Sequence, residues 1–184
     1  MHAELDAEKL EALRYPIGRF DLAKAVTGRE VETGLVRLAA LPGALRAALR
    51  GLSERQLATP YRPGGWTVRQ VAHHIADSQL NGYVRIRLAL TEDTPTIKPY
   101  DETRWAELDD AAHGPLEPSL VLLEALNQRS LPLFGALTPR ELAREFHHPE
   151  HARRLRVDTA LALYAWHGDH HTAHITRLAE REGW

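Results

Sequence analysis

The chain has 184 residues, of which 43% are hydrophobic and 26% charged, so its composition excludes a disordered or collagen-like protein. Its 23 Lys and Arg are balanced by 25 Asp and Glu, and this lack of a net positive charge argues against nucleic acid as a partner. Cysteine is absent, which excludes a thiolate nucleophile, a disulfide framework and a cysteine-based zinc site.

The sequence carries no pattern for export or membrane insertion. Residues 1–14 mix acidic and apolar side chains and lack the basic start and apolar core of a signal peptide. No apolar run approaches the roughly 20 residues that cross a bilayer. We therefore expect one cytoplasmic domain over residues 1–184, in which residues 1–14 form a peripheral or poorly ordered segment.

The first two long helices are predicted from apolar residues that recur every three or four positions. The first covers about 29–52, and Pro42 inside it predicts a kink or a break, because proline lacks an amide donor. A capping box of Ser53 and Gln56 then predicts a short helix. The second long helix covers about 67–90 and begins at a capping box of the same kind.

Two further long helices complete the predicted fold. The third covers about 118–137, with a kink expected at Pro132, and the last begins at Asp158 as N-cap and ends before Gly183. Short helices are expected in the connections over about 103–109 and 138–146. No segment shows the alternation of a strand, so the predicted fold class is all-α, a four-helix bundle with long connections and short extra helices.

The 11 histidines are clustered, and three of them suggest a metal site. His167 and His171 lie about 40° apart on a helical wheel, within the apolar stripe of the last helix. Buried imidazoles need polar partners, and a divalent metal is an economical partner for two rings at spacing i, i+4. On the second long helix, His74 lies in a polar seam and is the expected third ligand. Hydrogen-bonded packing of these histidines stays open as the alternative. The seam is formed by Gln70, Ser78, Asn81 and Arg85.

The remaining histidines and loop carboxylates are interpreted without a functional role. His73 points about 100° away from His74 on the wheel and is expected at the surface. The connector histidines are expected to be solvated; they are His147, His148 and His151. No role is assigned to His2 or His113, and the adjacent pair Asp101 and Glu102 is interpreted as solvated loop charge.

Motifs spread over nearly the whole chain resemble those of a known family. They are Tyr15-Pro16-Ile17-Gly18, Tyr61-Arg62-x-Gly64-Gly65-Trp66-Thr67-Val68-Arg69-Gln70, His73-His74-x-Ala76-Asp77-Ser78, Pro99-Tyr100-Asp101-Glu102 with Trp105, Trp166-His167-x-x-His170-His171-x-Ala173-His174-Ile175, and Gly183-Trp184. Together, from about residue 15 to the end, they resemble the YfiT-like metal-dependent hydrolases of the DinB/YfiT superfamily.

The resemblance implies a four-helix bundle that binds one divalent metal, nickel or zinc, through His74, His167 and His171. It also implies a homodimer and a small-molecule substrate, and we expect no nucleic-acid or membrane partner. Some relatives transfer a low-molecular-weight thiol such as bacillithiol or mycothiol. The wider superfamily often has Arg-Gly-Gln after the paired histidines, whereas this chain has Thr172-Ala173-His174. His174 therefore stands where a polar residue that supports the ligands is expected.

Three hypotheses of function stay open. In the first, a thiol bound at the metal loses its proton and attacks an electrophilic small molecule, with Asn81 and Arg85 orienting its anionic groups. The alternative is hydrolysis by metal-bound hydroxide, for which Asp77 and Asp169 are candidate bases, although the wheel places neither clearly beside the metal. The third is a non-catalytic binding protein stapled by the metal, with His174 as a fourth ligand.

Overall fold

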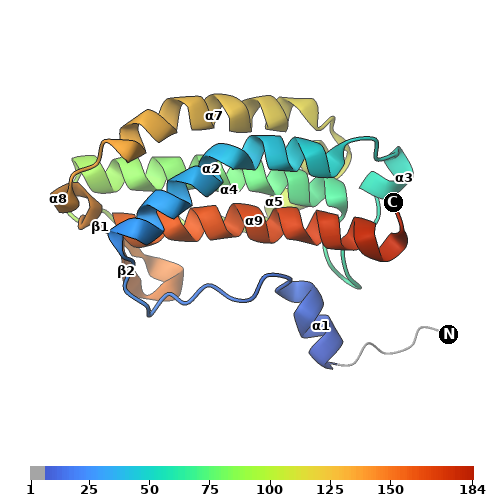
Figure 1. Cartoon of the computed structure of the whole chain (residues 1–184), viewed down its shortest axis with the longest axis horizontal. Helices are drawn as coiled ribbons and strands as arrows, with labels where there is room; N and C mark the ends of the chain where they lie inside the picture. Colours follow the sequence, from blue (N-terminus) through green and yellow to red (C-terminus); the bar gives the residue numbers. More distant parts are fainter. Residues whose placement is uncertain (1–6) are drawn as a thin grey trace.

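Four long helices lie side by side and form a bundle in the computed structural model, which describes residues 7–184 (Figure 1). They are α2 (Gly28–Leu49), α4 (Val68–Thr91), α7 (Glu117–Gly135) and α9 (Val157–Glu182). Helices α2 and α4 each pack against both α7 and α9. The predicted four-helix bundle is therefore confirmed. His2 and the side chain of His151 lie outside what the structure describes.

Short elements fill the connections between the long helices. They are α1 (Ala7–Arg14), α3 (Glu54–Leu57), α5 (Glu102–Ala106), α6 (Asp109–His113), α8 (Pro139–Leu142), the strand β1 (Glu145–His148), the 3-10 helix η1 (Pro149–His151) and the strand β2 (Arg153–Arg156). Helix α1 buries none of its residues and lies at the edge of the molecule (Figure 1). Within residues 7–184, none of the helices has the length and apolar character needed to span a membrane.

The antiparallel hairpin of β1 and β2 contradicts the prediction that the chain has no strands. Phe146 lies opposite Leu155, and both are buried in the core beside α4 and α9. The turn between the strands uses Ala152, whose φ of +47° is in the left-handed region. Each strand has only four residues, and such a short alternation gives too weak a periodic signal to recognise from sequence.

Several helix boundaries follow local capping chemistry, while others do not. Helix α4 begins with the predicted capping box, in which Thr67 accepts from the Gln70 amide and Gln70 bonds back. Helix α2 continues through the buried Pro42, so the helix is not broken at this proline. Asp158 is not the N-cap of α9, because that helix begins at Val157 and its N-cap is Arg156. The Asp158 carboxylate accepts from the Arg156 side chain and from the Thr159 amide.

Gly82 marks a close approach of α4 to α9, since an added Cβ would lie 2.7 Å from the Tyr164 ring. Gly82→Ala is expected to lower the unfolding free energy by about 1–3 kcal/mol, because the buried ring must move. Gly43→Ala in α2, where an added Cβ has nothing within 4 Å, is expected to raise it by about 0.5–1 kcal/mol. Urea unfolding measures both, and equal effects would contradict this view of the packing.

Candidate metal centre

His74, His167 and His171, the triad, converge between two facing helices. His74 comes from α4, and the other two lie one turn apart on α9. The possible ligand atoms of all three lie within 4.8 Å of one another. The Nε2 atoms of His74 and His167 are 3.3 Å apart. The structure thus brings together the three ligands expected from the sequence.

The triad is suited to a divalent cation by its protonation and its spacing. Burial lowers the pKa of His74 to about 4 and lowers those of His167 and His171 well below the usual value of 6.5, so all three rings are neutral near pH 7. The Ser78 hydroxyl lies 3.3 Å from Nδ1 of His167, which leaves Nε2 for a ligand bond. Two nitrogen ligands about 2.0–2.1 Å from a tetrahedral ion lie roughly 3.3 Å apart, as the two Nε2 atoms here do.

A second group of histidines adjoins the triad and shares His171 with it. His170, His171 and His174 also hold their possible ligand atoms within 4.8 Å of one another. Nε2 of His174 lies 3.1 Å from the main-chain oxygen of Arg14, and its ring stacks on Tyr61 at 3.9 Å. The buried Nδ1 atoms of these three histidines have no hydrogen-bond partner among the described residues. His174 therefore belongs to the neighbouring group rather than to the triad.

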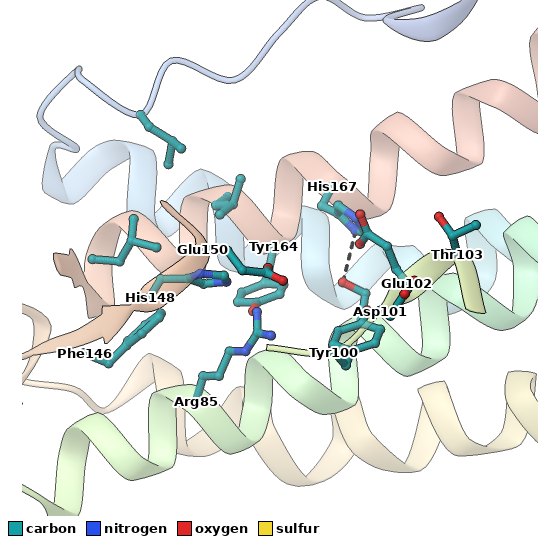
Figure 2. Close-up of a pocket in the computed structure, with 14 residues that line it drawn as sticks. Arg85, Tyr100, Asp101, Glu102, Thr103, Phe146, His148, Glu150, Tyr164 and His167 are labelled. Carbon is teal, nitrogen blue, oxygen red and sulfur yellow. Dashed lines mark hydrogen bonds between the residues drawn. The ribbon is translucent and has the colours of Figure 1, made fainter. Parts of the chain in front are cut away.

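Two pockets meet at the triad. The first, of about 520 Å³, is lined by Arg85, Tyr100, Glu102, Glu150, Tyr164 and His167 among others. The second, of about 500 Å³, is lined by Tyr15, Tyr61, Trp66, Glu102 and all members of both histidine groups. Glu102, Thr103 and His167 line both pockets. Glu102 extends from the start of α5 toward His167 (Figure 2), so this carboxylate borders both pockets at the candidate metal site.

Of Asp77, Asn81 and Arg85, the candidate residues on α4 outside the triad, the structure brings only Arg85 to one of the two pockets. Asn81 donates its side-chain amide to the main-chain oxygen of Asp77 one turn earlier, and neither residue lines the two pockets. Burial raises the pKa of the Asp77 carboxyl. Asp169 pairs with Arg37 across the bundle, with 2.5 Å between Oδ2 and Nε, and does not reach the pockets either. The two carboxylates considered as bases thus lie away from both pockets.

Two histidines predicted at the surface are buried, and these predictions are wrong. His73 is only 7% exposed, because α7 covers its side of α4 and Ser119 bonds its Nδ1 at 2.8 Å. His148 is 5% exposed and lines the first pocket, because alternate residues of β1 point inward. His113, to which no role was assigned, is exposed and bonds Asp109.

Glu102 is the residue of the site that sequence reasoning missed. It follows Asp101, which caps α5 by accepting from the Arg104 amide at 3.0 Å. Helix α5 therefore begins at Glu102, and this first residue lines both pockets. The available sequence signal is the motif Pro99-Tyr100-Asp101-Glu102, which contributes to the family resemblance and contains this residue.

Comparisons with known proteins find related chains. Residues 37–175 match the DinB superfamily. A Bacillus mycoides protein is 47% identical over 175 residues, covering 95% of this chain and 100% of its own, and a Bacillus cereus protein is 49% identical over 172 residues, covering 94% and 98%. Both carry the provisional name metal-dependent hydrolase.

Two solved structures resemble this chain. YfiT from Bacillus subtilis has a TM-score of 0.91 and 43% identity, covering 94% of this chain and 99% of its own. It is described as a probable metal-dependent hydrolase with an unusual four-helix bundle topology. The four-helix bundle protein TT2238 has a TM-score of 0.55 and 26% identity, covering 84% and 99%. The chain therefore belongs to the DinB superfamily and is a YfiT-like member of it.

The metal-free protein is expected to lose stability as the pH falls from about 6.5 toward 4. The pKa of His74 is about 4 in the fold and 6.5 when unfolded, so in this window the unfolded chain binds more protons. The loss from His74 alone is of the order of 3 kcal/mol at the acid end. Melting temperatures in a chelator from pH 7.5 to 4 measure it. His74→Gln is expected to flatten the slope, and an identical slope in both proteins would contradict the assignment.

Proposed function

We propose that this protein is an enzyme that uses one divalent metal, held by the triad, to activate a low-molecular-weight thiol for transfer to an electrophilic small molecule. The observation that carries the proposal is the convergence of three neutral imidazoles at the junction of two pockets. Each pocket has the volume of a small-molecule site. Two adjoining pockets suit a reaction between two substrates, one thiol and one electrophile.

The residues around the triad support such a reaction. A divalent cation at the triad would favour the thiolate over the thiol, and zinc or nickel suits imidazole ligands. Glu102 is the carboxylate placed to accept the thiol proton, because it borders both pockets beside His167. Ser78 holds the ring of His167 in orientation from α4. The chain has no cysteine that would compete with the thiol for the metal.

Metal-dependent hydrolysis is the second candidate, and the names of the Bacillus relatives favour it. A divalent cation also lowers the pKa of water, and Glu102 would then serve as the base for water instead of a thiol. The same side chains carry both proposals. Only the substrates that occupy the two pockets distinguish them.

A matched activity screen tests the proposal. Metal-loaded protein is incubated with a series of low-molecular-weight thiols and model electrophiles, and separately with esters and amides without thiol. We expect thiol conjugation that a chelator abolishes and that His113→Ala, at an exposed histidine, leaves intact. Turnover of an ester or amide without thiol would favour hydrolysis, and no metal-dependent reaction in either panel would reject both.

We also propose that the protein forms a homodimer, as the family resemblance implies. Light scattering on the purified protein measures it directly. A mass twice that of the chain supports a homodimer, and the mass of a single chain contradicts it.

A further inference from the structure

The second histidine group of α9 gathers buried nitrogens that have no partner. The possible ligand atoms of its three rings lie within 4.8 Å of one another. His170 is 6% exposed and His174 is 3% exposed. The Nδ1 atoms of His170, His171 and His174 are buried, and none of them has a hydrogen-bond partner within residues 7–184. Each unpaired nitrogen costs free energy, so three of them in one place point to a ligand that all three bind.

The hydrogen bond of His174 shows which of its two nitrogens is open to a cation. Burial lowers the pKa of His174 to about 4, so the ring is neutral near pH 7. Its Nε2 lies 3.1 Å from the main-chain oxygen of Arg14. A carbonyl oxygen only accepts, so Nε2 carries the ring proton and Nδ1 carries a lone pair. Histidine ligands of metals are commonly held in this way, with one nitrogen on the ion and the other donating to a carbonyl.

Aromatic neighbours hold two of these rings in position. The ring of His170 stacks on Trp166 with 4.5 Å between centroids, and the ring of His174 stacks on Tyr61 at 3.9 Å. The two imidazoles meet edge to face, with 4.4 Å between their centroids. Because neighbouring side chains already restrict both rings, a ligand that binds them has less side-chain freedom to remove.

The donor atoms at this place select a class of ligand. All three histidines of the second group line the second pocket, so an ion can reach them from there. Among the residues that line this pocket, only Glu102 carries a carboxylate. Imidazole nitrogens suit zinc, nickel and copper, whereas magnesium and calcium prefer oxygen ligands. The second group is therefore suited to a divalent transition metal.

His171 relates the second group to the triad, because it belongs to both. An imidazole has two ring nitrogens that point in different directions, and each can bind an ion. Nδ1 of His171 is the unpartnered nitrogen of the second group, which leaves Nε2 for the triad. With metal–nitrogen bonds of about 2.0–2.1 Å at both nitrogens, two ions on this ring lie about 6 Å apart.

We propose that His170, His171 and His174 bind a second divalent transition-metal ion through their Nδ1 atoms, and that His171 bridges this ion to the one at the triad. Binding at both nitrogens of His171 releases its ring proton to the solvent. The ligand nitrogens must also close to roughly 3.3 Å around a tetrahedral ion. Both requirements weaken the second site relative to the triad, so the second ion binds only when metal is added in excess. The site does not depend on the thiol chemistry of the proposed function.

A zinc titration of the whole protein counts the sites. Metal-free protein is titrated with zinc and followed by calorimetry, and the bound zinc is counted after equilibrium dialysis. We expect two ions per chain, the second bound at least about tenfold more weakly than the first. Purified protein to which no metal has been added is expected to retain only the tighter ion. One ion per chain with zinc in excess would overturn the proposal.

Variants assign the two ions to the two groups. His170→Phe keeps a flat ring against Trp166 but removes a nitrogen of the second group only, so we expect it to lose the weaker ion and keep the tighter one. His174→Ala is a second variant with the same expected result. His74→Ala alters the triad only and is expected to keep the weaker ion. His113→Phe, at an exposed histidine outside both groups, is the control and is expected to bind both ions. Two ions per chain in His170→Phe and His174→Ala would place the second ion elsewhere and overturn the proposal.

Copper tests the bridge through His171. One equivalent of copper(II) per chain is expected to give the electron paramagnetic resonance signal of an isolated ion. Two copper(II) ions joined by one imidazolate are magnetically coupled, so a second equivalent is expected to reduce this signal instead of doubling it. His170→Phe is expected to keep the signal of a single ion. The full signal of two independent ions in the unmodified protein would overturn the bridge.

These outcomes separate the second site from the proposed function. Two zinc ions per chain with the expected pattern of variants support the second site, even if the activity screen gives no reaction with thiols, esters or amides. Thiol conjugation by a protein that binds only one ion in excess zinc supports the proposed function and overturns the second site.

Discussion

Replacing His171 by alanine is expected to weaken divalent-metal binding by more than about 100-fold, beyond what the loss of a supporting residue costs. The reason is geometric, because His171 is the one histidine common to both groups of three. Its loss leaves two imidazoles in the triad. Elemental analysis of untagged protein and titration against a chromophoric chelator measure the effect. About one ion per chain is expected in the unmodified protein and almost none in the variant.

Two further variants distinguish the neighbouring histidine groups. His167→Ala removes a member of the triad only, and His174→Ala removes a member of the second group only. We expect His167→Ala to lose the metal and His174→Ala to keep it. The opposite result would move the metal to His170, His171 and His174. His113→Ala, at an exposed position on α6, is the control for a histidine remote from both groups.

Glu102→Gln is expected to lower kcat by about 10²–10⁴-fold, the usual contribution of a general acid or base. Glutamine keeps the shape of the side chain but cannot take up a proton near neutral pH. Glu102 lines both pockets beside His167, so the proton released there has this carboxylate as an acceptor. Steady-state kinetics with the thiol or ester found in the screen measure the loss.

Controls for this prediction separate chemistry from metal binding. Metal content is expected to stay unchanged in Glu102→Gln, because the triad supplies the ligands. Glu107→Gln alters a carboxylate at the other end of α5, outside both pockets, and is expected to retain full activity. A Glu102→Gln enzyme with unchanged kcat, or one that loses its metal, would exclude Glu102 as the base.

The bundle and the histidines of α9 could be predicted because they depend on contacts within one helix. Residues four apart share a face, so the spacing of His167 and His171 alone places both rings together. Capping boxes such as Thr67 with Gln70 span three residues, and the left-handed Gly183 ends α9 by its own backbone freedom. These features are properties of a short stretch of chain.

Features that depend on a neighbouring element could not be predicted in this way. A wheel of α4 places Asn81 and Arg85 in one seam, yet only Arg85 lines the first pocket, because Asn81 bonds the turn before it. His73 is buried because α7 covers it, and His148 because the β1–β2 hairpin folds onto the core.

The sequence by itself determined the four amphipathic helices, their caps and the pairing of two histidines on one face. Only the tertiary structure decided that Glu102 stands at the junction of two pockets and that Arg85 faces one of them without a carboxylate partner among the described residues. The physical reason is the range of the interactions involved. Helical periodicity and capping act over three or four residues, whereas a pocket is defined by side chains that meet from separate helices and loops.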